Sequence, residues 1–181
     1  MIIKSMTRKD ASFGQLVRYI GASASEHRLY ANLMKRDSAE IVAAFRANAG
    51  KLPVRANGVT IYHEVISITR STRLDIEVQK DLLHDIAERY VAARARRCMV
   101  YGALHDDKAH SLHYHLLISA NREGKEKRHR LNKAEFVAVQ RDLEAWVLRH
   151  YPQLEQTRVI GCKRRSNNPS VKQPNRSVAP E

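Results

Sequence analysis

The pattern of apolar and polar positions divides the chain into strand-like and helix-like segments. Runs rich in β-branched and other apolar residues predict strands at 1–6, 59–68, 97–104 and 112–119. Apolar residues that recur three and four positions apart predict helices at 12–20, 37–46, 74–95 and 132–150. Strands with helices between them predict an α+β fold, in which helices pack on an antiparallel β-sheet.

The first predicted helix carries a tyrosine at the edge of its buried face. Ser12 can cap this helix, and Gly21 ends it. Its apolar stripe consists of Phe13, Leu16, Val17 and Ile20. At ~100° per residue, Tyr19 lies about 120° from the centre of that stripe. Its hydroxyl can reach into a cleft, as a nucleophile or a DNA contact would, but an ordinary tyrosine at a buried boundary takes the same position.

The strand predicted at 59–68 carries polar residues on both of its faces. His63 and Ser67 share one face, and Glu64 lies on the other. A His or Glu inside a strand needs a polar partner. Structural pairing is the commoner outcome, although either side chain could line a functional cleft. The basic segment 22–36 is predicted to be partly helical and could cover a nucleic-acid groove.

Four of the nine histidines lie between positions 105 and 115. His113 and His115 alternate along one predicted strand and so share a face. A hairpin between 97–104 and 112–119 would bring His105 beside them. A His-x-His pair alone is more often structural, but three imidazoles from adjacent strands predict a divalent-metal site with open coordination positions.

Two acids and a further histidine lie in the loop predicted between these strands. Asp106 and Asp107 are close enough in sequence to orient an imidazole ring. His110 could be another ligand, a DNA contact or a residue without function.

The composition indicates a polyanionic partner. The 181 residues carry a net charge of +13, and the basic residues are spread over the whole chain. Nucleic acid is the first candidate for such a partner. The basic loop 122–130 is a possible phosphate-contacting arm, although such loops are more often merely solvated.

Length and segment composition predict one domain followed by a tail. The length suits a single domain at 1–160, and the basic segment 161–181 reads as a flexible linker that cannot form a core. Cys98 and Cys162 form neither a disulfide framework nor a ligand pair. No apolar run reaches membrane-spanning length and no signal-peptide pattern is present, so a cytoplasmic protein without membrane insertion is expected.

Three motifs, taken in order, resemble those of the relaxases of plasmid conjugation and mobilisation. These relaxases belong to the HUH (His-hydrophobe-His) endonuclease superfamily, and the likeness is closest to the class called MOBP. Residues 12–20 are similar to the first motif, whose Tyr, here Tyr19, is the nicking nucleophile. Residues 62–68 resemble the second, whose Ser, here Ser67, helps to position DNA. His105, His113 and His115 match the metal ligands of the third. Two departures are a hairpin loop one residue longer than is typical, and Lys108 and Ala109 where an acid is often found.

The resemblance implies an antiparallel, ferredoxin-like palm and a covalent mechanism. Tyr19 would nick single-stranded transfer-origin DNA and religate it through a phosphotyrosine. Asp106, Asp107 or Glu64 would help to deprotonate it. Mg²⁺ or Mn²⁺ would be the working ion, with Zn²⁺ or Ni²⁺ also able to bind three imidazoles.

The same resemblance implies partners. A basic surface would hold the DNA phosphates, with contributions from Arg18, Arg28, Lys35, Arg36 and Arg70. Accessory relaxosome proteins and the coupling and secretion machinery are the implied protein partners.

Two alternatives remain open at this stage. A rolling-circle replication initiator or related HUH nickase would use Tyr151 or Tyr30, but in those initiators the Tyr follows the His pair, whereas Tyr19 precedes it. The second alternative is a non-catalytic basic nucleic-acid-binding module whose histidines hold a structural ion.

Overall fold

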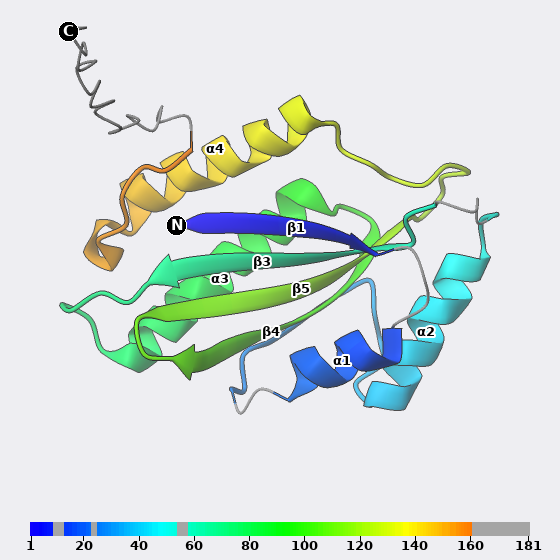
Figure 1. The fold of residues 1–181 in the computed structure, drawn as a ribbon, viewed down its shortest axis with the longest axis horizontal. Coiled ribbons are helices and arrows are strands. Elements are labelled where there is room, and N and C mark those ends of the chain that lie inside the picture. The colour runs from blue at the N-terminus through cyan, green and yellow to red at the C-terminus, as the bar shows by residue number, and fades with distance from the viewer. Residues whose placement is uncertain (9–12, 23–24, 54–57, 161–181) are drawn as a thin grey trace, which may run out of the picture.

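A five-stranded antiparallel sheet organises the computed structural model, which describes residues 1–8, 13–22, 25–53 and 58–160. Its strands lie in the order β1-β3-β5-β4-β2 (Figure 1). Their bounds are β1 Ile2–Arg8, β2 Arg28–Ala31, β3 Ile61–Thr69, β4 Cys98–Lys108 and β5 Ser111–Arg122. Because β5 pairs with both β3 and β4, it occupies the centre of the sheet.

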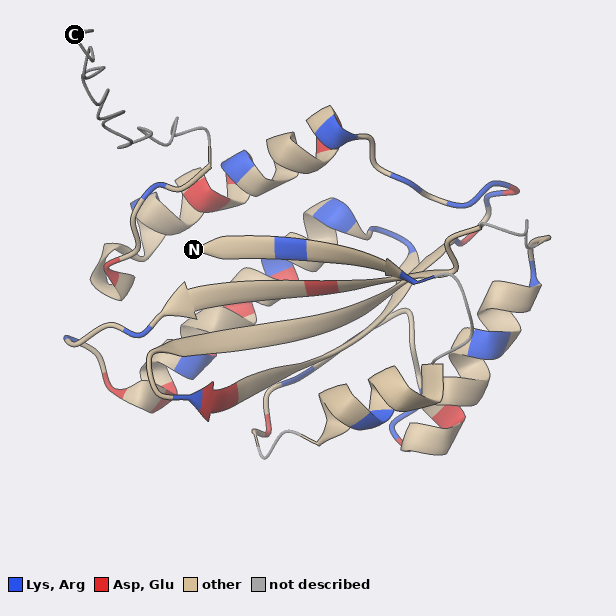
Figure 2. Ribbon diagram, viewed as in Figure 1, with Lys and Arg blue, Asp and Glu red and all other residues tan. Residues whose placement is uncertain are grey.

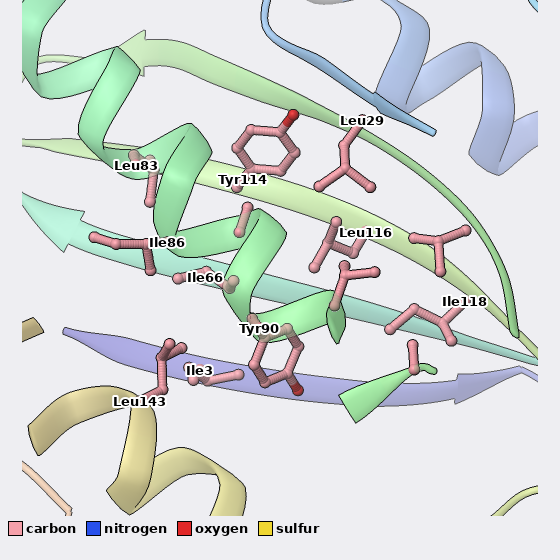
Figure 3. Close-up of a cluster of buried hydrophobic side chains, with 14 of the residues drawn as sticks. Ile3, Leu29, Ile66, Leu83, Ile86, Tyr90, Tyr114, Leu116, Ile118 and Leu143 are labelled. Carbon is pink, nitrogen blue, oxygen red and sulfur yellow. The ribbon is translucent and has the colours of Figure 1, made fainter. Parts of the chain in front are cut away.

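Four helices cover the two faces of the sheet. They are α1 Phe13–Gly21, α2 Ser38–Gly50, α3 Ile76–Arg94 and α4 Lys133–His150, and the short 3-10 turn Pro152–Leu154 follows the last. One apolar cluster joins α1 and α2 to Ile61, Ala103 and Leu117. A larger cluster joins α3 and α4 to the opposite face, where Tyr114 and Leu116 point (Figure 3). The predicted α+β architecture is confirmed.

Local capping explains where three of the helices begin. The Asp37 carboxylate accepts hydrogen bonds from the backbone N–H groups of Ala39 and Glu40 at the start of α2. Asp75 caps α3 in the same way. Asn132 and Glu135 form a reciprocal capping box on α4. The predicted cap of α1, Ser12, lies outside the described residues, as does the predicted linker 161–181.

The structure differs from the sequence expectation in two places. The segment 22–36 contains β2 rather than a partial helix; this strand has four residues and only Leu29 is buried, so it is too short to show a clear alternation. The β4–β5 hairpin is also tighter than expected, because its strands reach Lys108 and start again at Ser111. Asp106 and Asp107 therefore lie in a strand, not in a loop. In the described part of the chain, every helix is too short or too polar to cross a membrane.

Candidate active site

The β4–β5 hairpin brings the three predicted ligand histidines together. His105 pairs with His113 across the ladder, and His115 lies two positions further along β5. The ring centroids of His105 and His115 are 4.6 Å apart, and those of His113 and His115 are 6.1 Å apart. All three side chains are buried. They form one cluster on the face of the sheet that α1 covers.

Tyr19 lies over this cluster. Its ring centroid is 5.2 Å from that of His115 and 5.4 Å from that of His105. Tyr19 is nevertheless 49% exposed, unlike the apolar stripe of the same helix, which is buried. The phenol therefore contacts the imidazoles from the solvent side, where an extended ligand could reach both.

The C-terminal end of α1 is fixed by side chains of the site itself. A ring nitrogen of His105, Nε2, lies 3.2 Å from the carbonyl oxygen of Ile20. The Arg28 guanidinium donates to the carbonyl oxygen of Gly21 at 3.1 Å and to the Tyr101 hydroxyl at 3.1 Å. The last carbonyl groups of a helix have no partners within it. His105 and Arg28 supply those partners and so hold Tyr19 in place.

Each of the three histidines uses one ring nitrogen for orientation. A carbonyl can only accept a hydrogen bond, so Nε2 of His105 carries a proton and the lone pair of a neutral ring is on Nδ1. Nδ1 of His115 lies 3.0 Å from Nε2 of His63. Nδ1 of His113 lies 3.5 Å from the Ser67 hydroxyl, while its buried Nε2 has no hydrogen-bond partner among the described residues. Metal-ligating histidines are oriented through their second nitrogen in this way.

Burial favours the neutral form of three histidines here, His63, His113 and His115. Desolvation, helped by the nearby His105, lowers the pKa of His115 to about 3. Desolvation and the Arg8 guanidinium lower the pKa of His63 to about 4. Burial also lowers the pKa of His113. At neutral pH these rings are uncharged, which is the form that binds metals.

The donor set fits a divalent cation in kind, because each of the three imidazoles keeps one nitrogen uncommitted. The described residues contain no group of three or more His, Cys, Asp or Glu side chains already arranged around a common point as metal ligands. His63 lies on β3, next to His115 on β5. The alternation of residues along the strand predicted the face on which His63 lies, but the sequence did not show that β3 pairs with β5.

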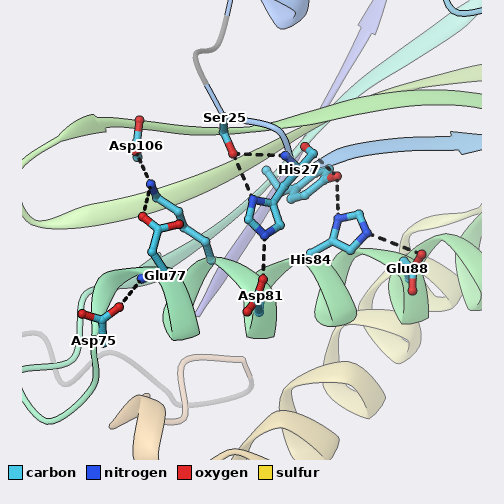
Figure 4. A network of polar contacts seen from close by, with 10 residues as sticks. Ser25, His27, Asp75, Glu77, Asp81, His84, Glu88 and Asp106 are labelled. Atoms are coloured by element: carbon cyan, nitrogen blue, oxygen red, sulfur yellow. Dashed lines mark hydrogen bonds and ion pairs between the residues drawn. The ribbon is translucent and has the colours of Figure 1, made fainter.

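The three acids singled out from the sequence have different surroundings. Asp107 is exposed, and its Oδ1 lies 3.7 Å from Nε2 of His113. Asp106 instead forms an ion pair with Lys80 at 2.8 Å, next to α3 (Figure 4), and its hydrogen bond with Lys80 lowers the pKa of its carboxyl. Glu64 is fully buried and accepts hydrogen bonds from Arg94 and Tyr90. Only Asp107 is brought to the histidines, so the geometry gives no support to a catalytic role for Asp106 or Glu64.

The basic residues predicted to contact DNA are divided between surface and structure. Arg18 is exposed on α1, next to Tyr19. Arg70 follows β3, and its guanidinium donates to the carbonyl oxygen of Asp106 at 2.8 Å. The Arg28 guanidinium instead donates to the carbonyl oxygen of Gly21 at the end of α1. His110 is exposed in the hairpin turn and lies outside the cluster.

A family model described as the relaxase MobA/VirD2-like nuclease domain matches residues 19–145. The match begins at the candidate nucleophile and includes all three candidate ligand histidines. The chain belongs to this relaxase family. A comparison with curated proteins found no match.

A solved structure supports the relaxase fold. The MobM relaxase domain, of the MOBV (Mob_Pre) class and solved bound to a 26-nucleotide pMV158 oriT DNA, superposes with a TM-score of 0.58. The comparison covers 96% of this chain and 95% of that one, at 17% sequence identity. The likeness at this identity concerns the fold, and the assignment to the MOBP class stays a prediction.

The two tyrosines that a replication initiator or related HUH nickase would use, Tyr151 and Tyr30, lie elsewhere. The Tyr151 hydroxyl donates to Asp85 at 3.3 Å on α3. Tyr30 stacks against Tyr101 and the Arg36 guanidinium on the β2 edge. Among the described tyrosines, Tyr19 alone makes ring contacts with the clustered histidines.

Proposed function

We propose that this relaxase domain nicks one DNA strand at the transfer origin of a plasmid or other mobile element, and religates it, to initiate conjugative mobilisation. The observation that carries the proposal is the half-exposed Tyr19 phenol above three buried imidazoles. A nucleophile that must reach a polymeric substrate needs this exposure. The substrate is single-stranded DNA, in keeping with the DNA present in the MobM structure.

The proposed reaction is a transesterification. The Tyr19 oxygen attacks the scissile phosphorus, a tyrosyl O–P bond forms, and the bond from phosphorus to the 3′ oxygen breaks. The phenol loses its proton and the departing 3′ oxygen gains one, which leaves a 5′-phosphotyrosyl link and a free 3′-hydroxyl. The Asp107 carboxylate, which lies 3.7 Å from Nε2 of His113, is proposed as the base that takes the phenol proton, directly or through water. The covalent link conserves the energy of the phosphodiester, so the reverse reaction religates the strand.

His105, His113 and His115 are proposed to hold a divalent cation, Mg²⁺ or Mn²⁺ in use and Zn²⁺ or Ni²⁺ as further ions that fit imidazole ligands. When bound, such an ion polarises a phosphoryl group and offsets the charge that develops on its oxygens. Ser67, Arg18 and Arg70 are proposed to position the strand. We further propose that the domain acts in the cytoplasm. Its proposed protein partners are accessory relaxosome proteins and the coupling and secretion machinery.

The decisive experiment asks whether Tyr19 forms the covalent link. Tyr19→Phe removes only the nucleophilic oxygen, so it is expected to abolish covalent protein–DNA adducts while oligonucleotide binding stays within a few-fold. The assay incubates the protein with a library of single-stranded oligonucleotides and Mn²⁺, and adducts are scored on denaturing gels.

Tyr151→Phe provides the matched control and should form adducts normally. Adducts at full yield with Tyr19→Phe would show that another residue attacks, as in a replication initiator. Binding without any adduct from the unmodified chain, whatever metal is added, would favour the non-catalytic module.

A further inference from the structure

Two adjoining surface hollows lie at the end of the sheet away from the β4–β5 turn. The first, of 580 Å³, lies between the C-terminal end of α3 and the end of β5, and the second, of 500 Å³, is formed by the loop that leaves β5. They share Arg122 and Lys125. We call the pair the basic basin, defined by Arg96, Arg97, Arg122, Lys125, Lys127 and Arg130. Figure 2 shows positive charge along this loop and at the end of α3.

The basic basin gathers positive charge without matching negative charge. Two alanines and four cations line its first hollow, and no acid does. Glu126 lines the second hollow. Within the described ranges, no acidic side chain forms an ion pair with any of the basin cations. Like charges held close together repel one another, so the basin is complementary to an anion that would neutralise several of them.

The loop that carries these cations is fixed at both ends. The Glu123 N–H donates to the carbonyl oxygen of Arg97 at 2.9 Å, and the His129 N–H donates to that of Ala120 at 2.6 Å. The Arg128 guanidinium donates to the carbonyl oxygen of Ala49, near the end of α2, at 3.1 Å and to that of Leu52, just after α2, at 2.9 Å. These bonds distinguish the loop from an ordinary solvated one. A fixed backbone presents its cations with less loss of conformational freedom on binding.

We propose that the basic basin binds the phosphodiester backbone of the DNA strand on which Tyr19 acts. This inference rests on the proposed function for the identity of the DNA. Arg122, which both hollows share, lies seven residues along β5 from His115, or ~23 Å at the rise of a strand. The first hollow is lined by α3, which covers the face of the sheet away from Tyr19. The basin would hold phosphates well away from the scissile one. Apart from His129 its lining contains no aromatic side chain on which a base could stack, so it would grip the strand without reading its sequence.

The experiment removes two basin cations from opposite walls. Arg97 has a φ of +65°, so Arg97→Gly removes the charge without backbone strain, and Lys125→Ser removes a second, exposed charge. The control, Arg141→Ser with Arg149→Ser, takes the same charge from the exposed surface of α4. All variants carry Tyr19→Phe, and binding of an oligo(dT) of about 24 nucleotides is measured by fluorescence anisotropy at several salt concentrations.

The basin variant is expected to bind more weakly and to show a slope of log affinity against log salt that is less steep by about 1.4, because each phosphate that is no longer neutralised reduces the slope by ~0.7. The control should keep the slope of the parent. Equal changes in both variants, or an unchanged slope in the basin variant, would overturn the inference. Because no cleavage is needed, a chain that never forms an adduct could still confirm the basin, and a chain that nicks normally could still refute it.

Discussion

His63 and His115 face each other from β3 and β5, with 3.0 Å between Nε2 and Nδ1. If His115 binds a cation through Nε2, its proton is on Nδ1 and must be donated to His63. His63 would then act as a positioning residue that fixes the ring and the tautomer of His115. The remaining nitrogen of His63, Nδ1, is buried and has no hydrogen-bond partner among the described residues. Few hydrogen bonds therefore set the orientation of this pair.

A pair of substitutions at His63 tests this role. His63→Leu removes the acceptor and is expected to weaken Mn²⁺ binding by ~10–100-fold. His63→Gln supplies a carbonyl oxygen in its place and should bind within a few-fold of the unmodified chain. Titration calorimetry with Mn²⁺, without DNA, gives the affinities.

His84→Leu is the control, because His84 bonds to Tyr114 on the other face of the sheet. Circular dichroism checks that each variant is folded. Unchanged Mn²⁺ affinity in folded His63→Leu would refute the positioning role.

The sequence could indicate which residues lie together where a single element sets their positions, and could not where distant partners set their surroundings. The spacing of His113 and His115 and the helical angle of Tyr19 are properties of single elements, and the structure brings these residues together. Asp106 pairs with Lys80 on α3, and Arg28 donates to the Tyr101 hydroxyl on β4 as well as to the end of α1. Lys80 and Tyr101 are far from these residues in sequence, so no local pattern could show either contact.

At the scale of elements, β4 and β5 approach closely where Gly102 lies. A Cβ atom at Gly102 would be 2.7 Å from a methyl carbon of Leu116 and 2.8 Å from the carbonyl oxygen of His115. The strand that carries two of the three candidate ligand histidines therefore depends on the absence of a side chain at this position of its neighbour.

Gly102→Ala is expected to destabilise the fold by ~1–3 kcal/mol, because the backbone of β5 cannot move aside without losing its ladder. At ~2–4 °C per kcal/mol the melting temperature should fall by several degrees. Gly50→Ala, at a helical position where nothing lies within 4 Å of the added atom, is the control and should be neutral or stabilising. Thermal unfolding followed by circular dichroism measures both, and an equal melting temperature for the two variants would contradict the argument.

The strand missed in the sequence, β2, is held by polar contacts instead of an apolar stripe. Just before β2, His27 lies 3.1 Å from the Ser25 hydroxyl and 2.8 Å from a carboxylate oxygen of Asp81 on α3 (Figure 4). The resulting Ser-His-Asp chain has the order of a catalytic triad, but the Ser25 oxygen also accepts the backbone N–H of His27, which is a turn contact. An element fixed by long-range polar bonds leaves little periodicity to detect.

At the scale of the whole molecule, one buried carboxylate joins three elements. Glu64 on β3 accepts hydrogen bonds from Ser5 on β1, at 2.9 Å, and from Tyr90 and Arg94 on α3, at 2.7 Å and 3.0 Å. The exposed fractions of the Glu64 and Arg94 side chains are 0% and 2%. The network links the edge strand β1 and the helix α3 to the interior strand β3, on the face of the sheet away from Tyr19.

Glu64→Gln keeps the shape but leaves the Arg94 charge buried without a counter-charge, which costs about 3–5 kcal/mol. The midpoint of urea unfolding should fall accordingly. Glu88→Gln, which removes an exposed partner of His84, should change stability by about 1 kcal/mol or less. Unfolding of both variants at the same urea concentration would show that the Glu64 network does not stabilise the fold.

The alternation along β5 has a further consequence for this architecture. Tyr114 lies in the large apolar layer, while its neighbours on either side point to the opposite surface. Inserting one residue upstream of this strand, with the ladder retained, would turn both imidazoles into the apolar interior and push the phenol of Tyr114 outward. The candidate site residues and the core residues thus occupy alternate positions of one strand, so a slip by one residue would disrupt the candidate site and the apolar core together.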